Sequence, residues 1–121
     1  MAEIKITKKN MYKDIYNYCR NNSDIRKELV DYDALEIVFT KLLKRMTPLL
    51  FRELTQKQRD IITLYYGHCL SQLTIAETLG ITQSTVSVLL NRALVTLNEY
   101  SMYIYNTMIL LESNNEKEKD Q

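Results

Sequence analysis

The sequence predicts an all-α fold, because apolar residues recur at helical spacing and residues that break helices are scarce. Among its 121 residues the chain has two Gly and one Pro. Apolar residues recur every three to four positions along most of its length, and no strand-like alternation competes in the region around residues 71–83. With 45% hydrophobic residues, a chain of this size can form one compact core.

The first predicted helix covers about residues 9–21 and follows a loosely attached N-terminal arm, residues 1–8. Its apolar positions share one face at spacings of three or four. They are Met11, Tyr12, Ile15, Tyr16 and Cys19. The polar stretch that begins at Asn21 predicts a loop. Residues 24–30 then form either a short helix or a continuation of that loop.

The second predicted helix begins near Asp33, because Asp33 and Glu36 have the spacing of a capping box. It ends or kinks near Met46, since Pro48 lacks a backbone N–H and restricts the residue before it. Its broad apolar face predicts a buried surface. That face consists of Leu35, Val38, Phe39, Leu42, Leu43 and Met46.

A third helix has the clearest start signal, because Thr55 and Gln58 form a capping box. It should run from Gln56 to Tyr66, where Gly67 ends it. Its inward positions are Ile61, Ile62, Leu64 and Tyr65.

Two further helices flank a glycine turn. Ser71 caps a short helix over about residues 72–79, Gly80 supplies a turn residue that tolerates positive φ, and Thr82 caps a helix that begins at Gln83. The expected inward residues are Leu73, Ile75, Ala76 and Leu79 before the turn, Ile81 within it, and Val86, Leu90 and Ala93 after it.

This arrangement is typical of a helix-turn-helix, in which the first turns of the second helix face base edges in the major groove. A small residue, Ala76, precedes Gly80 by four positions, as the close approach of the two helices requires. The start of the second helix is polar and uncharged. We therefore predict DNA base contacts at Gln83, Ser84, Thr85 and Ser87.

Residues 54–97 resemble region 4 of sigma-70-type factors. The resemblance rests on Leu54-Thr55 with Lys57 and Arg59, Leu64-Tyr65-Tyr66-Gly67, Ile75-Ala76-Glu77, Leu79-Gly80-Ile81, Thr85-Val86 and Arg92-Ala93. It implies a four-helix-type module that, in sigma factors, reads the −35 promoter element and contacts RNA polymerase. The second helix lacks the Arg and Glu residues of housekeeping factors, so that sequence preference is not carried over. Residues 1–53 contain no recognisable region 2, which makes small phage, plasmid and mobile-element regulators the closer resemblance.

The charge distribution places most cations outside the second half of the chain. Residues 1–60 hold 13 Lys/Arg and 9 Asp/Glu, whereas residues 61–121 hold 3 and 6, which gives a net charge of +1. The predicted phosphate contacts are Lys57, Arg59, Ser71, Thr82, Asn91 and Arg92. The alternative for the charged residues among them is a solvated helix face, and for Arg92 also an ion pair with Glu77.

The helix that begins at Gln83 has no stop signal, because neither Gly nor Pro follows Gly80. Apolar residues continue along it at heptad-like spacing, with Ser101 as one polar interruption. Two alternatives can bury this surface: a second copy of the chain, or the helix near residues 33–46. Dimerisation is the preferred prediction, through Leu94, Leu97, Ile104, Met108 and Leu111.

The sequence thus divides into an N-terminal helical segment (1–53), the helix-turn-helix (54–97), a C-terminal helix extension that dimerises (98–112) and a disordered, solvated tail (113–121). The predicted function is that of a sequence-specific, dimeric transcriptional regulator that binds double-stranded DNA, with RNA polymerase as a further partner. The alternative is a protein-interaction module that uses the region 4 fold without DNA, on RNA polymerase or a partner associated with the signal recognition particle.

Several function classes have no support in the sequence. No Gly-rich phosphate loop and no nucleophile–base set points to an enzyme, and no cofactor or small-molecule ligand is indicated. His68 beside Cys69 is too small a set for a metal site. The spacing of Cys19 and Cys69 favours free thiols in a reducing cytoplasm. No signal peptide and no membrane-spanning apolar run is evident, so a cytoplasmic protein without a membrane partner is expected.

Overall fold

The computed structural model describes residues 9–27 and 29–119, with side chains up to residue 112; the expected N-terminal arm, residues 1–8, lies outside them. The described residues form helices and connecting turns without a strand, which confirms the all-α prediction. The elements are α1 (Met11–Asn22), α2 (Tyr32–Phe51), α3 (Gln56–Ile62), the π-helical turn η1 (Thr63–Gly67), α4 (Gln72–Leu79) and α5 (Gln83–Lys119).

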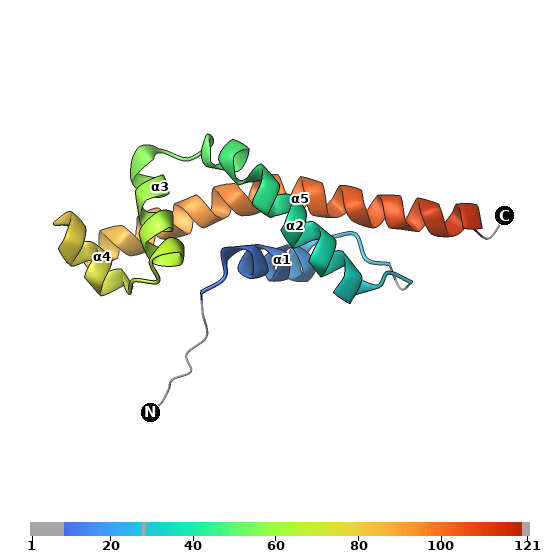
Figure 1. Cartoon of the computed structure of the whole chain (residues 1–121), viewed down its shortest axis with the longest axis horizontal. Helices are drawn as coiled ribbons and strands as arrows, with labels where there is room; N and C mark the ends of the chain where they lie inside the picture. Colours follow the sequence, from blue (N-terminus) through green and yellow to red (C-terminus); the bar gives the residue numbers. More distant parts are fainter. Residues whose placement is uncertain (1–8, 28, 120–121) are drawn as a thin grey trace, which may run out of the picture.

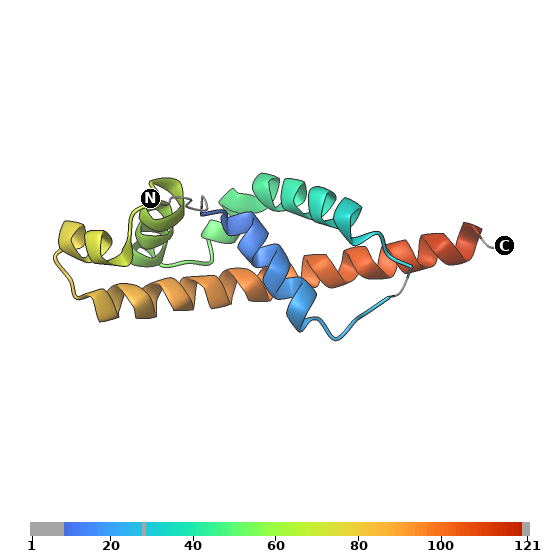
Figure 2. The ribbon, with the colours of Figure 1, turned by 90° about the horizontal axis from the view of Figure 1, so that it is seen from below.

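The long helix α5 is the axis on which the other elements pack (Figure 1). Helices α3 and α4 lie at its N-terminal end, while α1 and α2 lie along its middle (Figure 1). Seen from the perpendicular direction, α2, α3 and α4 lie on one side of α5 and α1 crosses it (Figure 2). Every one of these helices contributes to the same hydrophobic core.

Three aromatic rings join α1, α2 and α5. The rings of Phe39 and Tyr105 meet edge-on with centroids 5.6 Å apart, and Tyr16 lies 5.9 Å from Phe39 and 6.1 Å from Tyr105. All three are at most 1% exposed, and burial raises the pKa of Tyr105 to about 12. Tyr105 is therefore part of the core of a single copy of the chain. Such edge-to-face pairs stabilise beyond their buried area.

Helix α1 agrees closely with the sequence prediction. The side chain of Asn10 caps it by accepting a hydrogen bond from the Lys13 N–H, and four of its five predicted apolar residues are buried. Burial raises the pKa of the Cys19 thiol to about 12. The described residues between α1 and α2 form a loop, not the alternative short helix, and Ser23 Oγ accepts the Ile25 N–H at its start.

Helix α2 differs from the prediction at both ends. Asp31, not Asp33, is the N-cap, and its carboxylate accepts the Ala34 N–H at 3.1 Å. The helix continues through Pro48 to Phe51, because a proline near the helix end removes a single backbone bond, the one to the carbonyl of Lys44.

The predicted apolar face of α2 is only partly buried. Leu35, Phe39 and Leu43 are at most 5% exposed, but Val38 is 54% and Leu42 36% exposed. The helices α1 and α5 therefore cover only part of the apolar face of α2 that the sequence predicts.

Helix α3 begins with the predicted capping box, in which Thr55 and Gln58 bond each other's backbone N–H. It continues into η1, where the His68 N–H bonds the Thr63 carbonyl at 3.1 Å. The left-handed residue that follows is Cys69, with φ of 55°, rather than Gly67. The helical segment nevertheless ends at Gly67 as predicted.

Helix α5 continues to Lys119, whereas a disordered tail was expected from residue 113. The segment is rich in Glu and Lys and lacks Gly and Pro, so extending an existing helix costs little; residues 120–121 lie outside the described part. No single described helix is long and apolar enough to cross a membrane, although α4 and the Gln83–Glu112 part of α5 meet that criterion as a bent pair.

Candidate nucleic-acid interface

The turn between α4 and α5 has the geometry of a helix-turn-helix. The chain direction changes by 109° between the two helices, within the usual range for this motif. Gly80 adopts the left-handed conformation with φ of 68°, and the Ile81 N–H bonds the Ala76 carbonyl at 3.0 Å. Glycine is favoured at this position because any side chain would strain the backbone.

The inner faces of α4 and α5 hold this turn in place. Ile75, Val86 and Ala93 are completely buried, and Ala76 and Leu90 are 4% and 5% exposed. Small residues on both helices allow the close approach that the sequence pattern predicts.

Two of the predicted inward residues lie outside this contact. Leu73 is 54% and Leu79 39% exposed, because α4 is a short helix that packs mainly on α5 and buries only Ile75 and Ala76. Their prediction as core residues is wrong.

The predicted base-contacting residues lie exposed on the first two turns of α5. Thr82 caps the helix by accepting the Thr85 N–H at 3.1 Å, and the two hydroxyls lie 2.8 Å apart. The Thr85 hydroxyl is therefore already engaged in the cap. Gln83, Ser84 and Ser87 make no side-chain hydrogen bond within the described chain, so their polar atoms are free to bond a ligand.

The predicted phosphate contacts fall into two groups. Lys57, Asn91 and Arg92 are exposed and make no side-chain hydrogen bond to described residues, and Arg92 forms no ion pair with Glu77 there. The other three residues form hydrogen bonds within the fold. Ser71 caps α4 through the Thr74 N–H and Thr82 caps α5, while the Arg59 guanidinium donates to the Phe51 carbonyl at 3.1 Å and to the side chain of Gln56 at 3.0 Å.

A hollow of about 250 Å³ borders the polar face of α5 and contains a residue that the sequence analysis did not single out. Gln72, at the start of α4, lines it together with Ser87 and Asn91. Glutamine at the first position of a short helix has no distinctive sequence signal. Only the fold brings its amide beside the outer face of α5.

Helix α1 is tied to this region by contacts that join distant parts of the sequence. The Lys9 ammonium donates to the Leu70 carbonyl and lies 3.7 Å from the centre of the Tyr65 ring, and the Tyr66 hydroxyl donates to Asp14 at 2.9 Å. Burial, with Asp14 as a second cause, raises the pKa of Tyr66. No periodicity in the sequence could have identified these contacts.

The five residues predicted for dimerisation are not equally accessible. Leu97 is completely buried within the chain, so its side chain belongs to the core of a single copy. Leu94, Ile104 and Met108 are half-buried, and Leu111 is 56% exposed. The expectation that α5 packs on α2 as the alternative to dimerisation is met in part, since the two helices are in contact.

Among the described residues, no group of His, Cys, Asp or Glu is arranged to hold a metal ion.

A buried helix-turn-helix with a polar, exposed start of its second helix defines a domain of the DNA-binding class. Comparison with known families agrees, because residues 50–99 match the family described as Sigma-70, region 4. The chain therefore carries a sigma-70 region 4-like helix-turn-helix, a domain of DNA-binding, transcription-related proteins. No curated protein and no solved structure matches the chain.

Proposed function

We propose that this protein is a sequence-specific transcriptional regulator that binds double-stranded DNA as a homodimer. The observation that carries the proposal is the uncharged polar face at the start of α5, where Gln83, Ser84 and Ser87 are exposed and unengaged. A glutamine side chain can bond adenine bidentately in the major groove, and serine hydroxyls bond either acceptors or donors.

Three exposed residues beside the polar face of α5 are suited to contact DNA phosphates. Asn91 and Arg92 follow one or two turns later on α5, and Lys57 is exposed on α3. With so few cations, binding to random DNA should be weak, and the base contacts should account for a large share of the affinity. RNA polymerase is a further partner in this proposal, because region 4 of sigma factors contacts it.

The test is fluorescence anisotropy or gel shift with DNA that flanks the protein's own gene, over a salt series and with random-sequence competitor. The proposal expects a specific complex whose affinity falls as salt rises. A well-folded sample that binds no DNA at any salt concentration would contradict it. That outcome would favour a protein-interaction module, which a pull-down with RNA polymerase would then examine.

A further inference from the structure

A cavity of about 550 Å³ lies where the start of α1, the end of α2 and the π-helical turn η1 meet. We call it the α1–α2–η1 cavity. Tyr12, Phe51 and Ile62 form apolar walls, and Thr47 and Thr63 contribute hydroxyl groups. Apolar walls with a few polar groups, around a volume of this order, are typical of small-molecule sites. The lining residues come from distant parts of the sequence, so no motif predicted them.

The charged residues in the lining are all cationic. Among the described residues that line this cavity, Lys9 and Lys44 carry a charge and no carboxylate is present. The carboxylate of Asp14 contacts one lining residue, but it lies outside the lining and accepts the Tyr66 hydroxyl at 2.9 Å. Two cations beside apolar walls are complementary to an anion that carries an apolar body.

Both ammonium groups lie over aromatic rings and can bond a further acceptor. The Lys44 ammonium lies 5.7 Å from the centre of the Tyr12 ring, and it makes no hydrogen bond or ion pair to a described residue. The Lys9 ammonium lies 3.7 Å from the centre of the Tyr65 ring and donates to the Leu70 carbonyl. Because an ammonium group has three donors, one such bond leaves Lys9 able to form others.

The walls of the cavity are held by contacts that exist without a ligand. The hydroxyls of Tyr12 and Thr47 lie 3.0 Å apart, which joins α1 to α2, and the bond from Tyr66 to Asp14 joins η1 to α1. Residues of η1, among them Thr63, form one side, and π-helical turns occur frequently at functional sites. A site that is already formed requires little reorganisation when a ligand binds.

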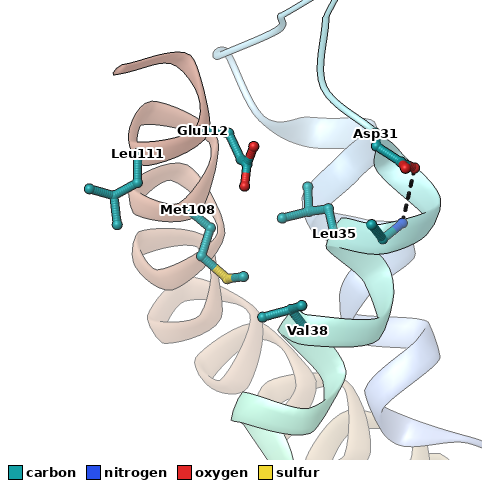
Figure 3. Close-up of a pocket in the computed structure, with 7 residues that line it drawn as sticks. Asp31, Leu35, Val38, Met108, Leu111 and Glu112 are labelled. Atoms are coloured by element: carbon teal, nitrogen blue, oxygen red, sulfur yellow. Dashed lines mark hydrogen bonds between the residues drawn. The ribbon is translucent and has the colours of Figure 1, made fainter. Parts of the chain in front are cut away.

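The groove between α2 and α5 provides a contrast in charge. It has a volume of about 290 Å³, and Leu35 and Val38 point into it from α2 and face Met108 on α5 (Figure 3). The carboxylates of Asp31 and Glu112 lie at one end of this groove (Figure 3). An apolar anion would be repelled by these carboxylates, so we expect it to bind in the α1–α2–η1 cavity instead.

We propose that the α1–α2–η1 cavity binds a small organic anion. Its apolar body contacts Tyr12, Phe51 and Ile62, and its carboxylate bonds the Lys44 ammonium. Lys9 adds a second positive charge to the same cavity. Such an ammonium–carboxylate bond is stronger beside apolar walls than in open solvent, because less water competes for the two charges. The site lies apart from the polar face of α5, so it adds a ligand-binding function to the DNA-binding fold.

The first test is a titration of the full chain with 4-phenylbutyrate, followed by amide chemical shifts in nuclear magnetic resonance. The neutral 4-phenylbutanamide is the matched ligand. The carboxylate should bind with a dissociation constant below about 1 mM and the amide about tenfold or more weakly, because the amide lacks the charge. The largest shifts should occur around Tyr12, Lys44 and Thr63. No saturable binding of 4-phenylbutyrate, equal affinity of the two compounds, or shifts confined to the groove between α2 and α5 would overturn the proposal.

The second test removes one of the two cations. Lys44→Gln should raise the dissociation constant of 4-phenylbutyrate by about tenfold or more, since it removes the charge and keeps most of the side chain. Lys41→Gln is the matched control, because Lys41 is exposed on the same helix and does not line the cavity. This control should change the affinity by less than about twofold. Equal effects of the two variants, or unchanged affinity of Lys44→Gln, would overturn the proposal.

The position of Tyr66 links this cavity to the DNA-binding end of the fold. Tyr66 lines the cavity and also the hollow that contains Ser87 and Asn91. We therefore expect saturating 4-phenylbutyrate to change the affinity for cognate DNA by about fivefold or more, and DNA to change the affinity for 4-phenylbutyrate by the same factor. Fluorescence anisotropy measures the first change, and the Lys44→Gln variant should lack it. Unchanged DNA affinity at saturating ligand would overturn this regulatory link.

The regulatory link rests on the proposed function, whereas the ligand site does not. The titrations with 4-phenylbutyrate use no DNA, so failure of the site is distinguishable from failure of the regulator proposal. A chain that binds the anion as described but binds no DNA would contradict the proposed function alone. A chain that binds specific DNA but not the anion would contradict the cavity site alone.

Discussion

The two halves of α5 differ mainly in their outer surfaces. From Gln83 to Leu97 the outer side carries the exposed polar residues Ser84, Ser87 and Asn91, together with the exposed Val88 and Val95. Beyond Asn98 the outer side carries Tyr103, Leu110 and Leu111, which are exposed and apolar. One continuous helix thus exposes mostly polar residues in its first two turns and large apolar residues in its C-terminal half.

The inner surfaces of the two halves are alike in burial but differ in what covers them. Val86, Ala93 and Leu97 are completely buried, as are Tyr105 and Ile109 further along. The first group packs on α3 and α4, whereas the second packs on α1 and α2. Because the inner side of α5 is buried along its whole length, only the outer side is available to bind a partner.

The two halves of α5 also differ in how far along the sequence their neighbouring helices lie. Helices α3 and α4 directly precede α5, so the N-terminal half meets neighbours that are close in sequence. The C-terminal half meets α1 and α2, whose contacts span long stretches, as in the bond between Ser23 and Asn106. Contacts of the first kind leave a local sequence motif, and contacts of the second kind do not.

The largest effect is expected at the aromatic cluster that joins the C-terminal half to the rest of the fold. Tyr105→Ala should lower the free energy of unfolding by about 3–5 kcal/mol, because it removes a buried ring and leaves a cavity. Urea denaturation followed by circular dichroism measures the change. Tyr103→Ala, on the same helix but 74% exposed, is the control and should stay within about 0.5 kcal/mol. Equal losses in the two variants would contradict the assignment of inner and outer sides.

A smaller loss, in binding rather than in stability, is expected at the polar end of α5. Gln83→Ala should weaken binding at the cognate site by about 1–3 kcal/mol, since a bidentate contact to a base is lost. The unfolding free energy should not change, because Gln83 is exposed. Titration by fluorescence anisotropy measures the affinity, with Asn17→Ala on α1 as an exposed amide control. Unchanged affinity of Gln83→Ala would mean that another surface reads the DNA.

Arg92→Gln should change the salt dependence of DNA binding more than its specificity. Loss of one phosphate contact reduces the slope of log affinity against log salt by about one. The ratio between cognate and random DNA should stay the same, since phosphates carry no sequence information. Binding titrations over a salt series give both quantities. A changed ratio with an unchanged slope would place Arg92 on a base instead.

The smallest effect is expected at Ser101, a buried polar residue in the C-terminal half of α5. Ser101 is completely buried, and its hydroxyl makes no hydrogen bond within the described chain. Ser101→Ala should therefore stabilise the fold by about 0.5–1 kcal/mol, because alanine favours the helix and buries no unpaired hydroxyl. Thermal unfolding measures the shift. A destabilised variant would show that the hydroxyl has a partner, such as a bound water molecule.

The sequence by itself determined the helix-turn-helix and most helix boundaries. The caps at Thr55, Ser71 and Thr82, and the left-handed Gly80, are interactions between residues at most a few positions apart. Such signals are legible in sequence because each depends on the chemistry of one short segment. The match to region 4 of sigma-70 factors covers the same part of the chain.

The tertiary structure decided which apolar residues are buried. On α2 the sequence pattern did not separate Val38 and Leu42 from their buried neighbours, and on α5 it placed Leu97 in a dimer interface, although Leu97 is completely buried within one chain. The reason is that α1 crosses α5 and covers part of it. The buried residues of α5 therefore do not follow the heptad spacing of its apolar residues. A choice between burial within one chain and burial between two copies depends on which helices meet, and hydrophobic periodicity does not specify the partner.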